Sequence, residues 1–204
     1  LHASGKLQTL AYKYDLERNL RTKDYAGFQL LGLNDYSGQG TALVGVLNVH
    51  WKEKGYCDAK DWTEFCSPIV PLAKFPRFVF SSENKVQVPV ELYNAYHEPL
   101  QNAEVTYEVK DENQQVLASG KLGKSSLPGN SLADNQNSLP VGKNIGLGNV
   151  SLDFPHLHIP SPSQLVLEIQ VKSSNAPVAR NHWDFWVYPS QIEMPNTKAL
   201  KDIY

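Results

Sequence analysis

Residues 27–55 read GFQLLGLNDYSGQGTALVGVLNVHWKEKG, so that a short apolar run, a polar loop and a second apolar run follow one another. The first run is bounded by glycine and by polar residues, which predicts a strand buried on both faces: Phe28, Leu30, Leu31 and Leu33. A polar loop follows over residues 34–40. Four apolar residues then recur at helical spacing before Gly55, namely Leu43, Val44, Leu47 and Trp51. The stretch therefore predicts a strand, a polar loop and an amphipathic helix.

The polar loop holds four candidate binding residues: Asn34, Asp35, Tyr36 and Gln39. In α/β folds, ligands bind at the loops that follow the carboxyl ends of strands. At such a place Asp35 would bind a ligand hydroxyl or hold a neighbouring side chain. Capping of backbone amides by a loop carboxylate is the alternative, and the sequence favours neither.

Composition excludes several classes of function. The chain has 204 residues, of which 41% are hydrophobic, and this length suits one sizeable domain or one domain with a fragment of another. A formal net charge of −2 provides no strongly basic face, so we expect no nucleic-acid partner. No apolar run reaches membrane-spanning length, so we expect no membrane insertion.

The two cysteines, Cys57 and Cys66, leave two readings open. A disulfide requires that the segment between them folds back. Two partly buried free thiols are the alternative. No four-ligand zinc spacing surrounds them, and we expect no metal and no cofactor.

The first part of the chain reads as helical. Residues 6–26 predict a helix with one apolar face, made of Leu7, Leu10, Ala11 and Tyr14 and extended by Leu16 and Leu20. The charge pairs Lys13/Glu17 and Glu17/Arg21 are expected on its solvated side. A second short helix is predicted after Asp58 or Asp61, with Trp62, Phe65 and Cys66 facing inward. Pro71 and Pro76 then predict a connector, with a domain boundary near residue 70.

Beyond residue 70 the apolar pattern changes to a period of two. Seven short strands are predicted over residues 77–80, 86–92, 105–109, 116–122, 150–154, 165–171 and 183–188. This number of half-buried strands predicts an antiparallel β-sandwich of immunoglobulin-like type. The last strand is aromatic, and its Trp183, Phe185, Trp186 and Tyr188 either fill the core and the contact with the other domain, as we expect, or stack on sugar rings. Residues 123–146 predict an exposed loop, with binding as its alternative role.

The stretch from residue 27 resembles the last strand-loop-helix unit of the catalytic barrel in glycoside hydrolase family 2, the β-galactosidase-like enzymes. The resemblance is carried by residues 27–31 and by GQGTALVG at residues 38–45, and the aromatic strand WDFWVYP at residues 183–189 fits the same group. It implies that residues 1–69 are the terminal segment of a (β/α)8 TIM barrel and residues 70–190 the sandwich that follows. Residues 191–204 would form a tail, and the fold class is α+β overall.

The resemblance also implies a function. Enzymes of this group hydrolyse β-linked sugars with retention, using two glutamates that come from earlier barrel strands, so no catalytic residue is carried over to this chain. The resemblance then implies that the chain is an inactive, structural fragment of a secreted hydrolase, located in the extracellular or periplasmic space. The carbohydrate substrate would bind to the parent enzyme. We expect the barrel-derived apolar surface to drive self-association. The alternative is a standalone carbohydrate- or protein-binding β-sandwich module.

Overall fold

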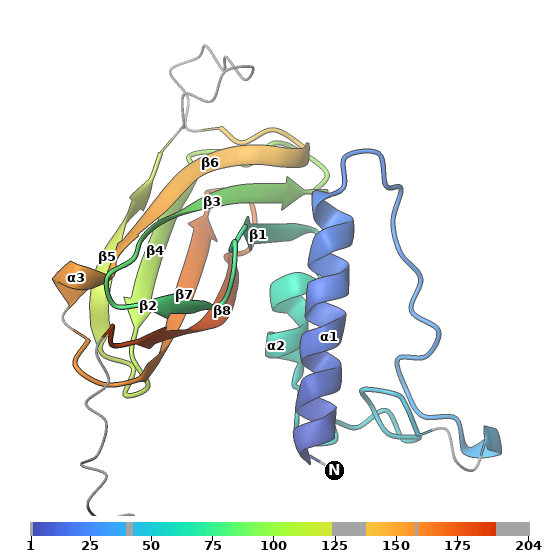
Figure 1. The fold of residues 1–204 in the computed structure, drawn as a ribbon. Helices are drawn as coiled ribbons and strands as arrows, with labels where there is room; N and C mark the ends of the chain where they lie inside the picture. Colours follow the sequence, from blue (N-terminus) through green and yellow to red (C-terminus); the bar gives the residue numbers. More distant parts are fainter. Residues whose placement is uncertain (1, 40–42, 124–137, 158, 191–204) are drawn as a thin grey trace, which may run out of the picture.

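The computed structural model describes residues 2–39, 43–123, 138–157 and 159–190, and it shows a mixed helix and sheet protein with two β-sheets (Figure 1). None of the helices in the described ranges combines the length and the apolar character that crossing a membrane requires. The elements follow one another as α1 (His2–Arg21), η1 (Ser37–Gln39), α2 (Ala59–Phe65), β1 (Ile69–Ala73), β2 (Val79–Ser81), β3 (Lys85–Asn94), β4 (Glu104–Lys110), β5 (Val116–Leu122), β6 (Gly142–Asp153), α3 (Phe154–Leu157), β7 (Ser163–Lys172) and β8 (Ala179–Tyr188).

The two sheets form a β-sandwich. One sheet has the strand order β1-β3-β6 and the other the order β2-β8-β7-β4-β5. β3 lies between β1 and β6, and β7 lies between β4 and β8, as strands B and F do in immunoglobulin-like sandwiches. The described strand pairs are antiparallel except that β2 lies parallel to β8, which corrects the prediction of a wholly antiparallel sandwich.

The core lies between the sheets because alternate residues of each strand point inward. One continuous cluster includes Val88, Val90 and Leu92 of β3 and Leu165, Leu167 and Ile169 of β7. Apolar residues recur at every second position of these strands in the sequence, and the same positions are the buried ones in the structure. Of the expected loop at residues 123–146, residues 124–137 lie outside the described part, and residues 142–146 belong to β6.

The aromatic side chains of β8 lie on both faces of its sheet. Trp183 and Phe185 are 2% and 0% exposed and belong to the core, as expected. Trp186 and Tyr188 are 38% and 43% exposed and do not lie in the core, because the pleat of the strand turns even-numbered residues of β8 to the outer face. The part of the prediction that places the aromatic residues at a contact with the other domain stays a prediction.

A strand also forms where the prolines predicted a connector. β1 pairs with β3, and Pro71 lies opposite Leu92 in the ladder. β1 is the outer strand of its sheet, which is where a residue without an N–H group is tolerated. The carbonyl of Pro71 accepts a hydrogen bond from Nδ2 of Asn181 in β8, 2.9 Å away.

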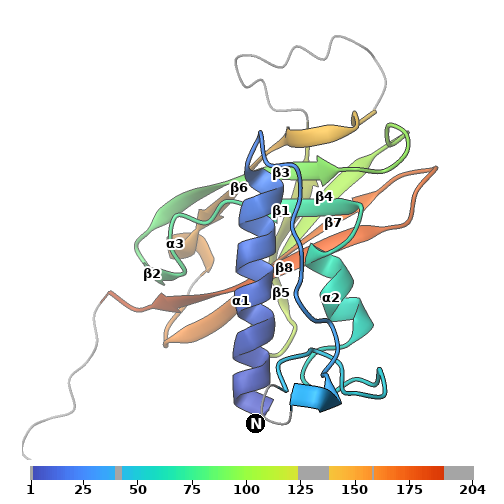
Figure 2. The same ribbon diagram turned by 90° about the vertical axis from the view of Figure 1, so that its right-hand side faces the viewer.

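The stretch at residues 27–55 does not fold as predicted. Residues 28–33 form no strand, and residues 43–51 form no helix. The strand-like pairing described here is limited to isolated bridges, from Asn34 to Leu47 and from Leu47 to Glu53. Leu31 is fully exposed and no strand among the described residues pairs with residues 28–33, and a lone strand is not stable in water. Figure 2 shows this segment running alongside α1.

Both cysteines are free thiols. Burial raises the pKa of the Cys57 thiol and that of the Cys66 thiol, which keeps both groups in the less reactive protonated form.

Candidate functional site

The loop predicted to bind a ligand is held by its own carboxylate. Asp35 is buried, and its Oδ1 accepts a hydrogen bond from the backbone N–H of Gly45 at 2.9 Å. Its Oδ2 pairs with Nζ of Lys54 at 2.8 Å. Lys54 Nζ also donates to the carbonyl of Gly45 at 2.6 Å, so the three residues close the loop as one unit.

The other three predicted residues do not share this arrangement. Asn34 donates from Nδ2 to the carbonyl of Asp35 at 3.0 Å, Tyr36 is exposed, and Gln39 ends η1. The contacts of Asp35 are those of a carboxylate that caps backbone groups, which is one of the two alternatives derived from the sequence. Ligand binding by Asn34, Asp35, Tyr36 and Gln39 stays a prediction.

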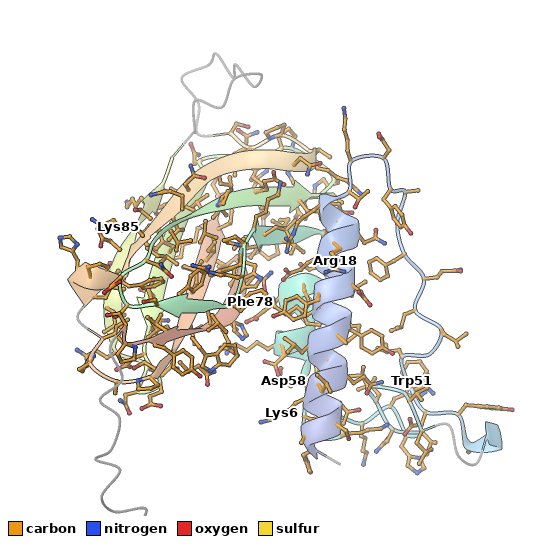
Figure 3. All side chains as sticks on the ribbon, viewed as in Figure 1. Lys6, Arg18, Trp51, Asp58, Phe78 and Lys85 are labelled. Atoms are coloured by element: carbon orange, nitrogen blue, oxygen red, sulfur yellow. The ribbon has the colours of Figure 1, made fainter. Side chains whose placement is uncertain are left out.

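Helix α2 provides one wall of a second candidate site. A capping box starts it: Asp58 Oδ1 accepts from the N–H of Asp61 at 2.7 Å, and the Asp61 carboxylate accepts from the N–H of Asp58 at 3.3 Å. This confirms the predicted short helix, and Figure 3 shows Asp58 at its start. Trp62 and Phe65 pack edge to face with ring centroids 5.1 Å apart.

Two hollows open between α2 and the outer face of the five-stranded sheet. The larger, which we call the α2 groove, has a volume of about 520 Å3, and its lining is dominated by charged side chains, including Lys60, Asp61, Glu64, Lys110, Glu168 and Asp184. The smaller, of about 450 Å3, has a more apolar lining, with Tyr96, Pro177 and Val178. Lys60, Glu64 and Arg180 line both hollows, so the two share one wall.

Glu64 joins α2 to the sheet at this shared wall. Its Oε2 lies 2.5 Å from Nδ1 of His182, and its Oε1 lies 3.6 Å from Nε of Arg180. The hydrogen bond to Glu64 raises the pKa of His182, partly opposed by burial of the ring. The carboxylate is thus engaged, and in the described part of the chain no three potential metal ligands gather here or elsewhere.

A buried ionic cluster fixes α1 to the sandwich. Glu17 is fully buried and accepts hydrogen bonds from Lys13 Nζ at 2.7 Å and from Arg21 Nη2 at 2.7 Å. From β8, Asn181 Nδ2 donates to the same carboxylate at 2.9 Å and Trp183 Nε1 donates at 3.1 Å. Lys13 also donates to Asn181, and burial lowers the pKa of this lysine.

This cluster corrects the predicted orientation of the first helix. The predicted pairs Lys13/Glu17 and Glu17/Arg21 do form, but they face the sandwich instead of solvent. Leu7 and Leu10, expected to face inward, are exposed. A buried carboxylate with several donors is stable where an unpaired one is not, so the polar stripe can form the contact.

The C-terminal end of α1 is anchored as well. Lys143 Nζ donates to the carbonyls of Thr22 at 3.3 Å and Tyr25 at 2.6 Å, and Asn144 Nδ2 donates to the carbonyl of Arg21 at 2.8 Å. These side chains of β6 satisfy carbonyl groups that the helix end leaves without partners. α1 is therefore held by both sheets.

Sequence reasoning missed the α2 groove and the role of Asn181. The groove is built from α2, β4, β7 and β8, and only the sheet register brings these elements together. One signal was present: alternation along residues 179–188 places Arg180, His182 and Asp184 on the face opposite Trp183.

Comparisons with known proteins identify a family but no activity. A family model described as "Domain of unknown function (DUF8488)" matches residues 84–189, from the start of β3 to the end of β8. No curated protein matches the sequence.

Solved structures resemble the chain only distantly. A β-glucuronidase from Parabacteroides merdae is similar with 17% identity and a TM-score of 0.37, over 59% of this chain and 14% of that one. CopC from Methylosinus trichosporium OB3b is similar with 12% identity and a TM-score of 0.35, over 61% of this chain and 99% of that one. The chain thus spans a small part of the β-glucuronidase, and TM-scores this low establish neither a shared fold nor a shared function.

Proposed function

We propose, on the premise that this chain belongs to the family described as a domain of unknown function (DUF8488), that it is the supporting part of a glycoside hydrolase acting on β-linked sugars. In this proposal the sandwich holds α1 and residues 22–55 in place for a catalytic domain. The retaining mechanism of such an enzyme uses two carboxyl groups, which the resemblance assigns to another part of the parent protein. The chain by itself is inactive.

The distribution of exposed apolar side chains carries this proposal. Of the exposed large hydrophobic side chains in the described ranges, eleven of seventeen lie between Leu7 and Trp51. They occupy α1 and the segment beyond it, and Figure 3 shows Trp51 on the side of α1 away from the sandwich. Apolar surface gathered on one side of a protein is typical of a surface that another domain covers.

The anchoring of α1 supports the same proposal. A helix tied down by the Glu17 cluster and by Lys143 presents a fixed surface to whatever packs on its far side. Asn34, Asp35, Tyr36 and Gln39 lie on the segment beyond that helix, so in the parent enzyme they would stand where a sugar could meet both parts. Secretion to the extracellular or periplasmic space belongs to this proposal, since polymeric sugars are met there.

An immunoprecipitation tests the proposal. An antibody raised against the pure chain would be used on an extract of the source organism, and the precipitate would be assayed with aryl β-glycosides. We expect a protein several times larger than 22.8 kDa that hydrolyses at least one of them, and no turnover by the pure chain. A precipitated protein of 22.8 kDa without activity, or turnover by the pure chain, would contradict the proposal.

A further inference from the structure

The outer face of β8 carries a row of half-buried and exposed side chains that point away from the core of the sandwich. Along it lie Arg180, His182, Asp184, Trp186 and Tyr188, each two residues from the next. Neighbours in such a row are about 6.7 Å apart. Trp186 and Tyr188 are not among the side chains that pack on the core, so two aromatic rings stand side by side at the surface.

The sheet register extends this row into a surface. On β7, Val166 lies opposite Asp184 and Gln164 lies opposite Trp186. Both of these β7 residues, together with Asp184, also line the α2 groove. The aromatic pair therefore lies at one end of the groove, and α2 forms the wall at the other end, beside His182.

The side chains of this surface fall into two groups. Glu64 is engaged by His182, and Glu168 is engaged by Lys110 Nζ at 2.9 Å. Asp184 is half-buried and Gln164 is exposed, and the side chain of neither makes a hydrogen bond or an ion pair with a described residue, although the Asp184 carboxylate interacts with His182 electrostatically at longer range. Next to two aromatic rings the groove thus offers a carboxylate and an amide that form no hydrogen bond within the described residues.

The charges of the groove indicate what kind of ligand fits. Acidic side chains outnumber basic ones in its lining, which disfavours a phosphate or another anion, and the basic Lys60 and Arg180 within it disfavour a cationic peptide. An uncharged ligand with many hydroxyl groups would find both donors and acceptors here. Flat aromatic rings offer the apolar contact that the ring C–H faces of such a ligand need.

We propose that the outer face of β8 and β7 binds a neutral oligosaccharide. Trp186 and Tyr188 stack against successive sugar rings, while Asp184 and Gln164 bond to their hydroxyl groups at the mouth of the α2 groove. This site is separate from the loop at residues 34–39. It does not depend on the chain being part of a hydrolase, and it equally suits a standalone binding module.

A binding experiment on the whole chain tests this site. The chain would be applied to an array of neutral and acidic oligosaccharides that includes cellohexaose, xylohexaose and heparin fragments, and hits would be measured by calorimetry and by tryptophan fluorescence. We expect binding to at least one neutral oligosaccharide. Trp186→Ala and Tyr188→Ala should each weaken that binding about tenfold or more, while Trp186→Phe, which keeps a ring, should weaken it less.

Trp51→Ala is the matched control, because Trp51 is an exposed tryptophan on the far side of α1. It should bind as the unchanged chain does, and all variants should melt within about 4 °C of the unchanged chain, since neither Trp186 nor Tyr188 packs on the core. The inference is wrong if no neutral oligosaccharide binds, if only acidic ones bind, or if folded Trp186→Ala and Tyr188→Ala bind normally. The size of the native protein is a separate measurement, so this result and the immunoprecipitation can fail independently.

Discussion

The indole Nε1 of Trp183 donates a hydrogen bond to Oε2 of Glu17, 3.1 Å away, and so joins the last strand of the sandwich to the first helix. Both groups are buried, and the bond spans 166 positions of sequence. The same carboxylate accepts from Lys13, Arg21 and Asn181, so one side chain organises the contact between α1 and β8.

Removing that carboxylate should be costly. Glu17→Ala leaves the buried ammonium of Lys13 without its partner, and breaking a buried ion pair in this way costs about 3–5 kcal/mol. The free energy of unfolding, measured in urea, is the test. Glu83→Ala is the control, since Glu83 is exposed and its loss should change stability by less than about 0.5 kcal/mol. Equal stabilities for the two variants would mean that the cluster does not hold α1.

Adjacent positions of β8 should respond very differently to truncation. Phe185 is fully buried among Phe75, Phe80 and Phe154, with ring centroids 5.5–6.0 Å apart, so Phe185→Ala should cost about 3–5 kcal/mol. Trp186→Ala, one residue further on the outer face, should cost less than about 1 kcal/mol. Thermal and urea unfolding would compare them. A reversal of this order would contradict the assignment of the two faces.

The contact between His182 and Glu64 should make stability depend on pH. The pKa of His182 is raised in the folded protein, so the contribution is complete below the unfolded value of about 6.5 and is lost as the pH rises through the folded value. Its size should stay below about 1 kcal/mol, because the ring is partly exposed. The unchanged chain should therefore gain stability over His182→Gln on going from pH 9 to pH 5.5. A difference that is constant across this range would show that the pair is not linked to protonation.

Asp35 should control the loop and not the fold. Asp35→Ala removes the acceptor of the Gly45 N–H, so hydrogen exchange at that amide should become at least several-fold faster. Exchange at core amides such as that of Leu167 should be unchanged. Lys54→Met, which removes the ion pair but keeps the acceptor, is the control and should have a smaller effect on Gly45. Unchanged exchange at Gly45 in Asp35→Ala would show that another group holds the loop.

The exposed apolar side chains should cause the pure chain to associate. We expect the mass measured by light scattering to rise with protein concentration, because apolar surface of this extent is seldom left uncovered. Leu31→Lys combined with Leu43→Lys should reduce the rise, whereas Val116→Lys, at an exposed position on the sandwich, should not. A constant monomer mass at high concentration would contradict this expectation.

The sandwich strands could be predicted from the sequence because the alternation of apolar and polar residues matches the alternation of buried and exposed side chains in the folded sheets. Val88, Val90 and Leu92 alternate with polar or exposed residues, and the same alternation decides which of them reach the core. β1 was missed because Pro71 signals a break, and only the sheet order shows that β1 is an outer strand, where proline is tolerated.

The N-terminal part was harder to predict because its burial depends on distant residues. The charged side of α1 faces inward only because Asn181 and Trp183, more than 160 positions later, supply donors to Glu17. The run at Phe28 has the composition of a buried strand, yet in this chain no described strand lies beside it. For Asp35 the sequence offered backbone capping as one of two roles, but its partners Gly45 and Lys54 depend on how the loop closes and could not be derived from the sequence.

The bond between Asn181 and Pro71 has a consequence for solubility. An outer strand normally offers N–H and C=O groups to which a strand of another molecule can add, which is how sheets grow into aggregates. At the middle of β1, Pro71 has no N–H to offer and its carbonyl is already occupied by Asn181. Addition of a strand at the centre of β1 is therefore disfavoured, so this outer strand is protected at the position where a new ladder would need both groups.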